Sequence, residues 1–265
     1  MSFESRFGQA ADAYQTFRPD YPAEIFQRIL AWIPADKPRQ KNRDAQAARD
    51  CAIDLGAGTG KASRELVKSF REVIAIEPDP LMVEKLREEA PRATIVQITA
   101  EEYEREQSSA DLVNFAQSLH WMDIPRVLEK CRGWLRTGGI LAVYGFGLPE
   151  AVEPVRGIVR LELREHWSRY RDERLRRKHF PQCLVHEQPG IRVVEDAKLS
   201  HSCKMTPGEF AGFWRSTSYG GAYGRALDAP EVYWQDLESR FRAAWKEDKI
   251  PVDFKPYLLI ARKEQ

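Results

Sequence analysis

The chain has 265 residues, of which 43% are hydrophobic, and its 41 basic and 40 acidic side chains leave a net charge of +1. A chain of this size can bury a sizeable core as one globular domain. Its near-neutral charge gives no overall electrostatic attraction to nucleic acid or to a membrane surface.

The N-terminus and the cysteines indicate where the protein works. Residues Met1–Arg6 lack the apolar segment of a signal peptide, and no stretch approaches the roughly 18 apolar residues of a membrane span. The four cysteines form no C-x-x-C pair, and Cys51 and Cys131 fall in strand or helix patterns as small core residues. We therefore expect a cytoplasmic protein with no metal centre.

An aromatic segment opens the chain. Within residues 1–22, Phe7 and Tyr14 share one helical face, and Pro19 and Pro22 end the helix. Because the segment precedes the strand of the candidate ligand site, we expect it to form a lid across that site. The alternative is a helix that only adds to the core.

After a helix predicted over residues 23–33 and a polar loop over 34–50, a strand, a tight turn and a helix are predicted over Cys51–Val67. The turn carries the alternating glycines Gly56, Gly58 and Gly60. Glycines there allow positive φ and let a ligand approach the backbone.

Several ligand classes compete for this turn. A dinucleotide fingerprint needs G-x-G-x-x-G, but here the third glycine comes one residue early. A phosphate-binding loop needs G-x-x-x-x-G-K-[ST]; Gly60 and Lys61 fit its end, but Ala62 replaces the Mg²⁺-binding hydroxyl and Leu55 the first glycine. The pattern of residues 54–60, D-x-G-x-G-x-G, resembles motif I of class I S-adenosylmethionine (SAM) methyltransferases. An ordinary strand-to-helix connection is the remaining interpretation.

A second strand pattern, Val73–Glu77, ends in a carboxylate one helix-length after the glycines, and Pro78 ends the strand. In doubly wound folds an acid at this place accepts hydrogen bonds from ribose hydroxyls. We therefore expect Glu77 to bind the sugar of a nucleotide-like ligand; the alternative is a solvated strand end.

The third strand pattern, residues 93–98, is followed by Ala100 and Glu101. They come at a carboxyl end, where open α/β sheets bind ligands, and are candidate ligand contacts.

The fourth strand, residues 111–116, leads into Gln117–Asp123, which carries an amide, a hydroxyl, an imidazole and an indole within five residues. Asp123 is a predicted N-cap of the helix over residues 124–135. His120 lies in the loop, where binding residues concentrate, and is the candidate catalytic residue. A structural histidine bonded to a nearby carbonyl is the alternative.

A fifth strand is predicted over residues 140–147, and the alternation of strands with helices predicts a parallel, doubly wound sheet. Residues 149–190 are helical and charged. Their basic stretch, residues 169–178, favours a solvated helix face over a nucleic-acid patch; some of its cations are also candidates for attracting an anionic substrate.

The C-terminal third continues with a strand over residues 191–205 and a helix that begins at Thr206 with a capping box and ends at Gly220-Gly221. A second helix over 232–245 and a terminal strand over 255–262 complete the chain.

The glycine turn, Glu77 and the strand order resemble class I SAM-dependent methyltransferases of the type-11 kind. Three further segments are similar to the trans-aconitate and cantharidin-type small-molecule methyltransferase group. Residues 7–22 resemble its F…A…Y…RP-x-YP opening, 117–123 its Q-[AS]-x-H-W-x-D, and 213–218 its Y-L-R-[ST]-W-S, with Thr217 in place of the tryptophan. That departure leaves the substrate open.

The resemblance implies a Rossmann-like sheet of about seven strands whose last strand is antiparallel. It also implies a single domain over residues 1–265, monomeric or homodimeric. Residues 1–22 would be its lid, and 149–190 and 206–250 its substrate-cap insertions.

The residues and the resemblance together give two sets of site residues. The expected SAM contacts are Tyr14, Arg18, Asp54, Gly56, Gly58, Gly60, Glu77, Pro78, Ala100, Glu101 and Gln117. The expected acceptor pocket is lined by Tyr21, His120, Trp121, Arg215, Ser218 and Tyr219. Arg215 offers a bidentate fork to a carboxylate, so its replacement by alanine should impair an acidic acceptor more than SAM binding.

The expected activity is SAM-dependent methyl transfer to a small molecule, most of all O-methylation of a carboxylic acid or hydroxyl group. A carboxylate needs no base, whereas a hydroxyl would use His120. S- or N-methylation and a SAM-binding protein without transfer are the alternatives. We expect no nucleic-acid substrate, because no N-P-P-Y-like motif follows the fourth strand, and no membrane partner.

Overall fold

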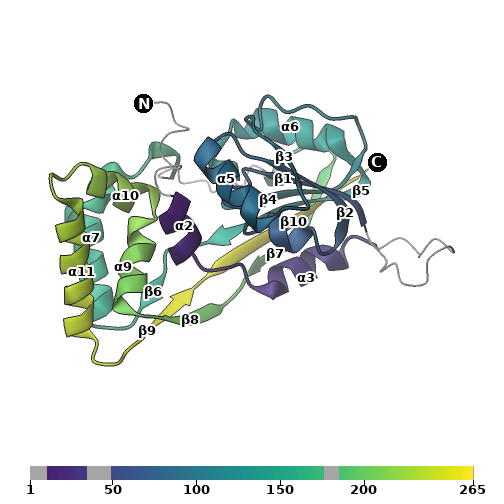
Figure 1. Cartoon of the computed structure of the whole chain (residues 1–265). Coiled ribbons are helices and arrows are strands. Elements are labelled where there is room, and N and C mark those ends of the chain that lie inside the picture. Colours follow the sequence, from purple (N-terminus) through teal and green to yellow (C-terminus); the bar gives the residue numbers. More distant parts are fainter. Residues whose placement is uncertain (1–10, 35–48, 176–184, 265) are drawn as a thin grey trace. The chain divides into compact units, whose positions relative to one another are not determined.

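The computed structural model describes residues 11–34, 49–175 and 185–264. The chain divides into two compact units. The sheet unit consists of Asp20–Gly145, Lys178–Lys198 and Tyr257–Gln265, and the helical unit of Met1–Pro19, Phe146–Arg177 and Leu199–Pro256. Figure 1 labels most of their helices and strands.

The sheet unit contains a seven-stranded sheet in the order β3-β2-β1-β4-β5-β10-β7. Its strands are β1 (Arg49–Leu55), β2 (Phe70–Ile76), β3 (Thr94–Val96), β4 (Ala110–Ala116), β5 (Leu135–Phe146), β7 (Ile191–Lys198) and β10 (Pro256–Lys263). Strands β1 to β5 pair in parallel, and β10 is inserted beside β5 and runs antiparallel to β7. The predicted fold class, including the antiparallel last strand, is confirmed.

Among the described residues, α3 (Ala23–Ala31) precedes β1, and the connections between strands contain α4 (Ser63–Leu66), α5 (Pro80–Glu89), η1 (Leu119–Trp121) and α6 (Ile124–Trp134). Side chains set where two of them begin. The Asp79 carboxylate accepts hydrogen bonds from the first backbone amides of α5, and Asp123 caps α6 in the same way, as predicted.

The core of this unit lies on both faces of the sheet. Ala52 and Ile53, neighbours on β1 that point to opposite faces, are both fully buried. On one face α6 contributes Val127 and Leu128 to the main apolar cluster; on the other, Leu86 of α5 packs in a second cluster. Strands buried on both faces have continuous apolar sequences, so the strands of this sheet could be predicted from the sequence.

The helical unit contains α2 (Ala11–Phe17), α7 (Val155–Glu165), η2 (Trp167–Tyr170), η3 (Glu173–Leu175), α9 (Pro207–Arg215), α10 (Ser218–Arg225) and α11 (Pro230–Ala244). Figure 1 shows α7, α9, α10 and α11 gathered together. A small antiparallel sheet in the order β6-β9-β8 joins them, formed by β6 (Glu150–Ala151), β8 (His201–Met205) and β9 (Ile250–Phe254). Among the described residues, no helix has the length and apolar character needed to cross a membrane.

Two sequence predictions in this region were wrong. The predicted strand over residues 191–205 is two strands in different sheets, because β7 pairs with β10 and β8 with β9. The predicted helix from Thr206 also does not end at Gly220-Gly221. It begins with the predicted capping box but stops at Arg215, and Thr217 caps a new helix, α10, that contains both glycines. A Cβ at Gly220 would lie 2.2 Å from the Trp214 carbonyl oxygen, so this glycine permits close packing.

Candidate functional site

The carboxyl ends of β1 to β4 lie along one edge of the parallel sheet. The register pairs Leu55 with Ile76, Ile76 with Val96, and Asp54 with Asn114. The residues that follow these strands, where the sequence analysis placed its cofactor candidates, therefore share one edge. In open α/β sheets this edge is where ligands bind.

The glycine turn after β1 leaves its backbone open at one position. Gly56, Gly58 and Gly60 all have positive φ, at 66°, 57° and 91°. A Cβ at Gly56 would lie 2.6 Å from Cβ of Ser118, whereas a Cβ at Gly58 would meet no atom within 4 Å. Gly56 is thus required by packing inside the protein. Gly58 faces open space, as a position approached by a ligand would.

Glu77, the residue after β2, is tied to this turn. Its carboxylate accepts hydrogen bonds from the amide of Gly58 at 2.8 Å and from the amide of Asp79 at 3.0 Å. The side chain is buried. Burial first, and then the nearby charges of Asp79 and Asp54, raise its pKa to about 7, against the opposing effect of the hydrogen bonds from the two amides. A carboxylate has about four acceptor positions, so two remain for ribose hydroxyls. Pro78 follows it, half-buried.

Asp54 lies beneath the turn and is fully buried. One carboxylate oxygen accepts from the Ser63 hydroxyl at 2.6 Å and the other from the Asn114 amide at 2.8 Å. Burial raises the pKa of Asp54, although these two hydrogen bonds oppose the shift. Because the carboxylate is fully enclosed and tied to Ser63 and Asn114, its part in the site is to fix the turn between β1, α4 and β4.

Lys61, the residue that suggested a phosphate-binding loop, is occupied within the protein. Its ammonium is nearly buried and pairs with Asp20 at 3.0 Å, and Arg64 pairs with the same carboxylate at 2.6 Å. An ammonium held this way, beside Ala62 in place of a metal-binding hydroxyl, does not favour the phosphate-loop alternative.

The residues after β3 have mixed roles. Ala100 is buried in the main apolar cluster. The Glu101 carboxylate accepts a hydrogen bond from the Asp123 amide at 2.7 Å, so it joins this loop to the start of α6.

Gln117, at the end of β4, adopts φ of 61°, which few residues other than glycine tolerate. The backbone N–H of Gln117 donates to the Tyr144 carbonyl at 2.8 Å. A Cβ at Gly145 would lie 1.7 Å from the side-chain oxygen of Gln117, so Gly145 provides the space for the side-chain amide.

His120 and Trp121 form η1, directly after Gln117 and Ser118 at the same edge of the sheet. Their rings lie 4.6 Å apart, and both side chains are half-buried. Tyr21 belongs to the same unit, where its ring packs edge-on against Tyr144 at 5.0 Å.

The remaining candidates lie in the helical unit. The Arg18 guanidinium lies over the rings of Tyr14, at 5.3 Å, and Phe213, at 4.7 Å. Its Nε donates to the Ser216 hydroxyl at 2.9 Å. Tyr14 and Arg18 are therefore brought together with α9. The lid residues before Ala11, including Phe7, lie outside the described residues.

Arg215 already holds a carboxylate. Both arms of its guanidinium donate to Glu231, at 2.8 and 2.6 Å, and its side chain is 42% exposed. The fork expected to receive a substrate is thus engaged by α11. Ser218 begins α10, and Tyr219 beside it is buried.

Thr59, between Gly58 and Gly60, was missed as a candidate. Its hydroxyl is buried and has no hydrogen-bond partner among the described residues. An unpartnered buried hydroxyl inside a ligand-binding turn is a candidate cofactor contact. The signal was present in the sequence, because Thr59 is a hydroxyl residue inside the glycine motif.

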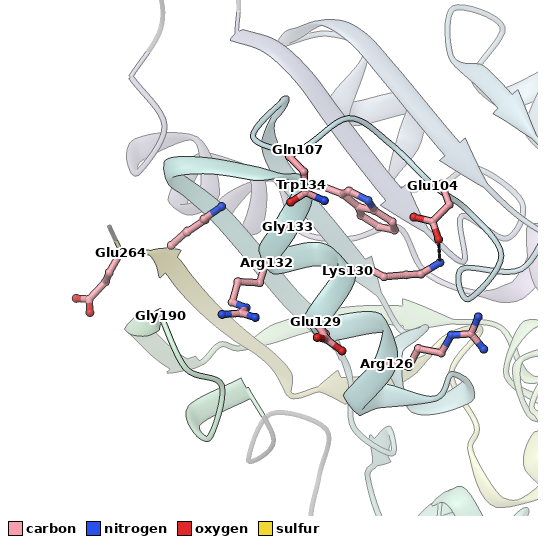
Figure 2. A pocket seen from close by; sticks show the side chains of 11 residues that line it. Glu104, Gln107, Arg126, Glu129, Lys130, Arg132, Gly133, Trp134, Gly190 and Glu264 are labelled. Carbon is pink, nitrogen blue, oxygen red and sulfur yellow. Dashed lines mark ion pairs between the residues drawn. The ribbon is translucent and has the colours of Figure 1, made fainter.

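A wide hollow of about 660 Å³ beside α6 is a weaker candidate (Figure 2). Two of its cations are engaged: Lys130 pairs with Glu104 at 2.8 Å, and Lys263 donates to the Leu135 carbonyl at 2.7 Å. The hollow also lies at the amino end of β5, away from the edge that carries the glycine turn. Across the described parts of the chain, no three acidic, histidine or cysteine side chains gather as a metal site would require.

Residues 53–143 match a family model described as a methyltransferase domain. A candidate methyltransferase of Dictyostelium discoideum is 26% identical over 99% of this chain and 96% of its own length. An uncharacterized methyltransferase of Mycobacterium tuberculosis is 36% identical, and that match spans 52% of this chain and 50% of the relative.

Solved structures agree with these relatives. A candidate type II methyltransferase from Anaeromyxobacter dehalogenans matches 93% of this chain and 98% of its own, at 25% identity and a TM-score of 0.69. Phosphoethanolamine N-methyltransferase 2 of Haemonchus contortus, solved with SAM, has a TM-score of 0.53 at 17% identity, over 100% of this chain and 60% of its own.

The architecture is the α/β Rossmann-like methyltransferase fold. Together, the fold, the matched domain and the relatives support a class I methyltransferase, the class whose methyl donor is SAM.

Proposed function

We propose that this protein binds SAM over the Gly56–Gly60 turn and transfers its methyl group to a small-molecule acceptor, most of all to an oxygen of a carboxylic acid or hydroxyl group. The observation that carries the proposal is the open space over Gly58, whose amide is held by the buried Glu77 carboxylate. A side chain at position 58 would fill the place that the cofactor needs.

The residues at this edge fit that cofactor. Glu77 retains acceptor capacity for the ribose hydroxyls, with Pro78 beside it. The backbone of Gly56, Gly58 and Gly60 would support the methionine part, and the unpartnered Thr59 hydroxyl is a further donor toward it. The other proposed SAM contacts are those predicted from the sequence. They are Ala100 and Glu101 near the adenine, Gln117 in the loop after β4, and Tyr14 and Arg18 in the N-terminal segment.

When bound, SAM supplies a methyl group activated by a sulfonium. The protein's main task is to align acceptor and donor and to exclude water. Holding the two reactants in the right orientation can lower the activation barrier by about 7–11 kcal/mol. A carboxylate acceptor forms the new O–C bond as the C–S bond breaks, and no proton moves. A hydroxyl acceptor must also lose its proton, and His120 is the proposed base, with a contribution of about 10²–10⁴ in rate.

The candidate acceptor contacts are considered within each unit by itself. Tyr21, His120 and Trp121 are the candidates of the sheet unit, and Ser218 and Tyr219 are those of the helical unit. Because Glu231 holds Arg215, that residue is not carried forward as the anion receptor.

Calorimetry with SAM and with S-adenosylhomocysteine tests the cofactor proposal. Gly58→Ala should weaken both at least about tenfold, because the added methyl group enters the open space and the residue must keep a positive φ. Gly138→Ala is the matched control: Gly138 also has positive φ, at 78°, but lies on β5 at the opposite edge, where its Cβ would meet only the flexible Arg262 side chain.

Equal losses in the two variants, or no affinity of the wild type for either compound, would contradict the proposal. A screen of acids, phenols, amines and thiols with radiolabelled SAM then identifies the methylated atom. S- or N-methylation, or SAM binding without turnover, are the outcomes that would replace O-methylation.

A further inference from the structure

A small cavity lies wholly within the helical unit. Its volume is about 190 Å³, and it is lined by Leu148, Leu163, Ser168, Arg171 and Tyr219. That space equals the liquid volume of roughly six water molecules at about 30 Å³ each, so it suits a compact ligand. Of these residues, Tyr219 was predicted from the sequence as an acceptor contact. Arg171 belongs to the basic stretch of residues 169–178.

Leucine side chains and polar donors share the lining of the cavity. Leu148 and Leu163 give it apolar surface, and Leu148 is 46% exposed, more than a large apolar side chain usually is. Ser168, Arg171 and Tyr219 bring a hydroxyl, a guanidinium and a phenol. A ligand that satisfies both kinds of surface has an apolar body and one polar end.

The polar end of the ligand must accept hydrogen bonds and carry negative charge. The described residues of the lining include no carboxylate, and Asp172, the residue after Arg171, is paired with Arg174 at 3.1 Å. Among the described residues, the Arg171 guanidinium makes no ion pair. An exposed guanidinium of this kind is a receptor for an anion.

Tyr219 strengthens this preference. Burial raises its pKa to about 12, against the opposing effects of the charges of Arg18 and Arg171 and of a hydrogen bond with Thr217, so its hydroxyl stays protonated and able to donate. The ring of Trp214 lies 6.4 Å from that of Tyr219, and its buried indole N–H has no partner among the described residues. The indole N–H of Trp214 is therefore a further unsatisfied donor near Tyr219.

We propose that this cavity binds a small monocarboxylic acid with an apolar body, whose carboxylate is received by Arg171 and the Tyr219 hydroxyl. Only one cation lines the cavity among the described residues, and the two leucines would desolvate additional charges, so tricarboxylic acids are disfavoured. The acid's role as the methyl acceptor rests on the proposed function.

Calorimetry of the full chain with benzoate, its uncharged isostere benzamide, and propane-1,2,3-tricarboxylate tests the cavity without SAM. Benzoate should bind at least about tenfold more tightly than either other probe, because only benzoate supplies one carboxylate on an apolar ring. Arg171→Gln should weaken benzoate at least about tenfold and abolish its advantage over benzamide. Tyr219→Phe, which removes only the hydroxyl, should weaken benzoate several-fold.

Two further variants provide comparisons. Arg169→Gln removes a neighbouring exposed cation that does not line the cavity and should leave benzoate affinity unchanged. Arg215→Gln decides between the two arginines: the inference requires that it keep benzoate binding. SAM affinity and far-UV circular dichroism, measured on every variant, show that each is folded.

The inference is overturned if benzoate and benzamide bind equally, if the tricarboxylate binds best, or if Arg215→Gln loses benzoate while Arg171→Gln retains it. Failure of the proposed function is a separate result, because a protein without SAM affinity can still bind benzoate in this cavity. Conversely, a protein that binds SAM normally but not benzoate refutes only the present inference.

Discussion

The Glu77 carboxylate accepts a hydrogen bond from the Gly58 amide at 2.8 Å, which joins the acid after β2 to the glycine over which the structure is open. The same carboxylate accepts from Asp79 at 3.0 Å, and Asp79 caps α5. A single buried side chain thus fixes the turn, the end of β2 and the start of the next helix. Its replacement should affect both the cofactor and the fold.

Glu77→Gln should weaken SAM binding about 10- to 150-fold, since hydrogen bonds to a charged group are worth about 1.5–3 kcal/mol. It should also lower the free energy of unfolding by about 1–3 kcal/mol, because the new NH₂ group faces the amide of Gly58 or Asp79. Calorimetry and urea unfolding measure the two effects. Glu72→Gln, at the exposed start of the same strand, is the control and should change neither appreciably.

The raised pKa of Glu77 predicts a pH dependence. With a pKa of about 7 in the free protein, SAM affinity should fall about tenfold between pH 8 and pH 6, because ribose hydroxyls donate to the ionised form. The stability of the fold depends on pH with the opposite sign. Since the pKa is raised above its ordinary value of 4.5, the stability from this group is full below that value and is lost as pH rises through about 7. An unchanged pH slope in Glu77→Gln would show that another group titrates.

Most of the sheet unit could be predicted from the sequence. Its strands are short apolar runs because both faces are buried, and the glycine turn and Glu77 stand at the ends of such runs. The helical unit was harder. Whether residues 191–205 form one strand or two depends on β9 and β10, which come some 50 residues later in the chain and decide the pairing.

Candidate site residues show the same limit. The spacing of the glycines and the acid predicts that Gly58 and Glu77 lie close together, because parallel pairing of β1 and β2 brings the ends of both strands to the same side of the sheet. The sequence does not show that Glu231, 16 residues further on, occupies the fork of Arg215. Nor does it show that Arg171 lines a cavity with Tyr219, because that neighbourhood is created by long-range packing.

Gly145→Ala should distort the loop after β4. The added Cβ would lie 1.7 Å from the side-chain oxygen of Gln117 and 2.9 Å from the hydroxyl of Tyr257, so Gln117 must move. We expect the free energy of unfolding to fall by about 1–3 kcal/mol, as for other overpacked sites. Thermal unfolding measures this. Gly147→Ala, whose Cβ would make an ordinary contact at 3.6 Å, is the matched control.

A second substitution identifies the cause of that loss. Adding Gln117→Ala to Gly145→Ala should restore part of the stability, because the colliding amide is gone while the contact with the Tyr257 hydroxyl remains. If the two losses simply add, the collision with Gln117 does not explain the effect.

The helical unit contains a buried carboxylate, Glu162, whose side chain is 2% exposed. It accepts from the Tyr233 hydroxyl and from Arg240 at 2.7 Å. Glu162→Ala should lower the free energy of unfolding by about 3 kcal/mol, at the low end for a broken buried pair, because Arg240 remains one-third exposed and keeps Asp236 at 3.6 Å.

Chemical unfolding of Glu162→Ala beside Glu165→Ala separates this network from charge loss alone. Glu165 is exposed on the same helix and pairs only with exposed groups, so its removal should cost less than about 0.5 kcal/mol. A double-mutant cycle with Tyr233→Phe should give a coupling of about 0.5–3 kcal/mol, since both side chains belong to one hydrogen-bond network. Zero coupling would mean that Glu162 does not contribute through its hydrogen bond with Tyr233. Equal losses at positions 162 and 165 would mean that the buried network adds nothing beyond the loss of a charge.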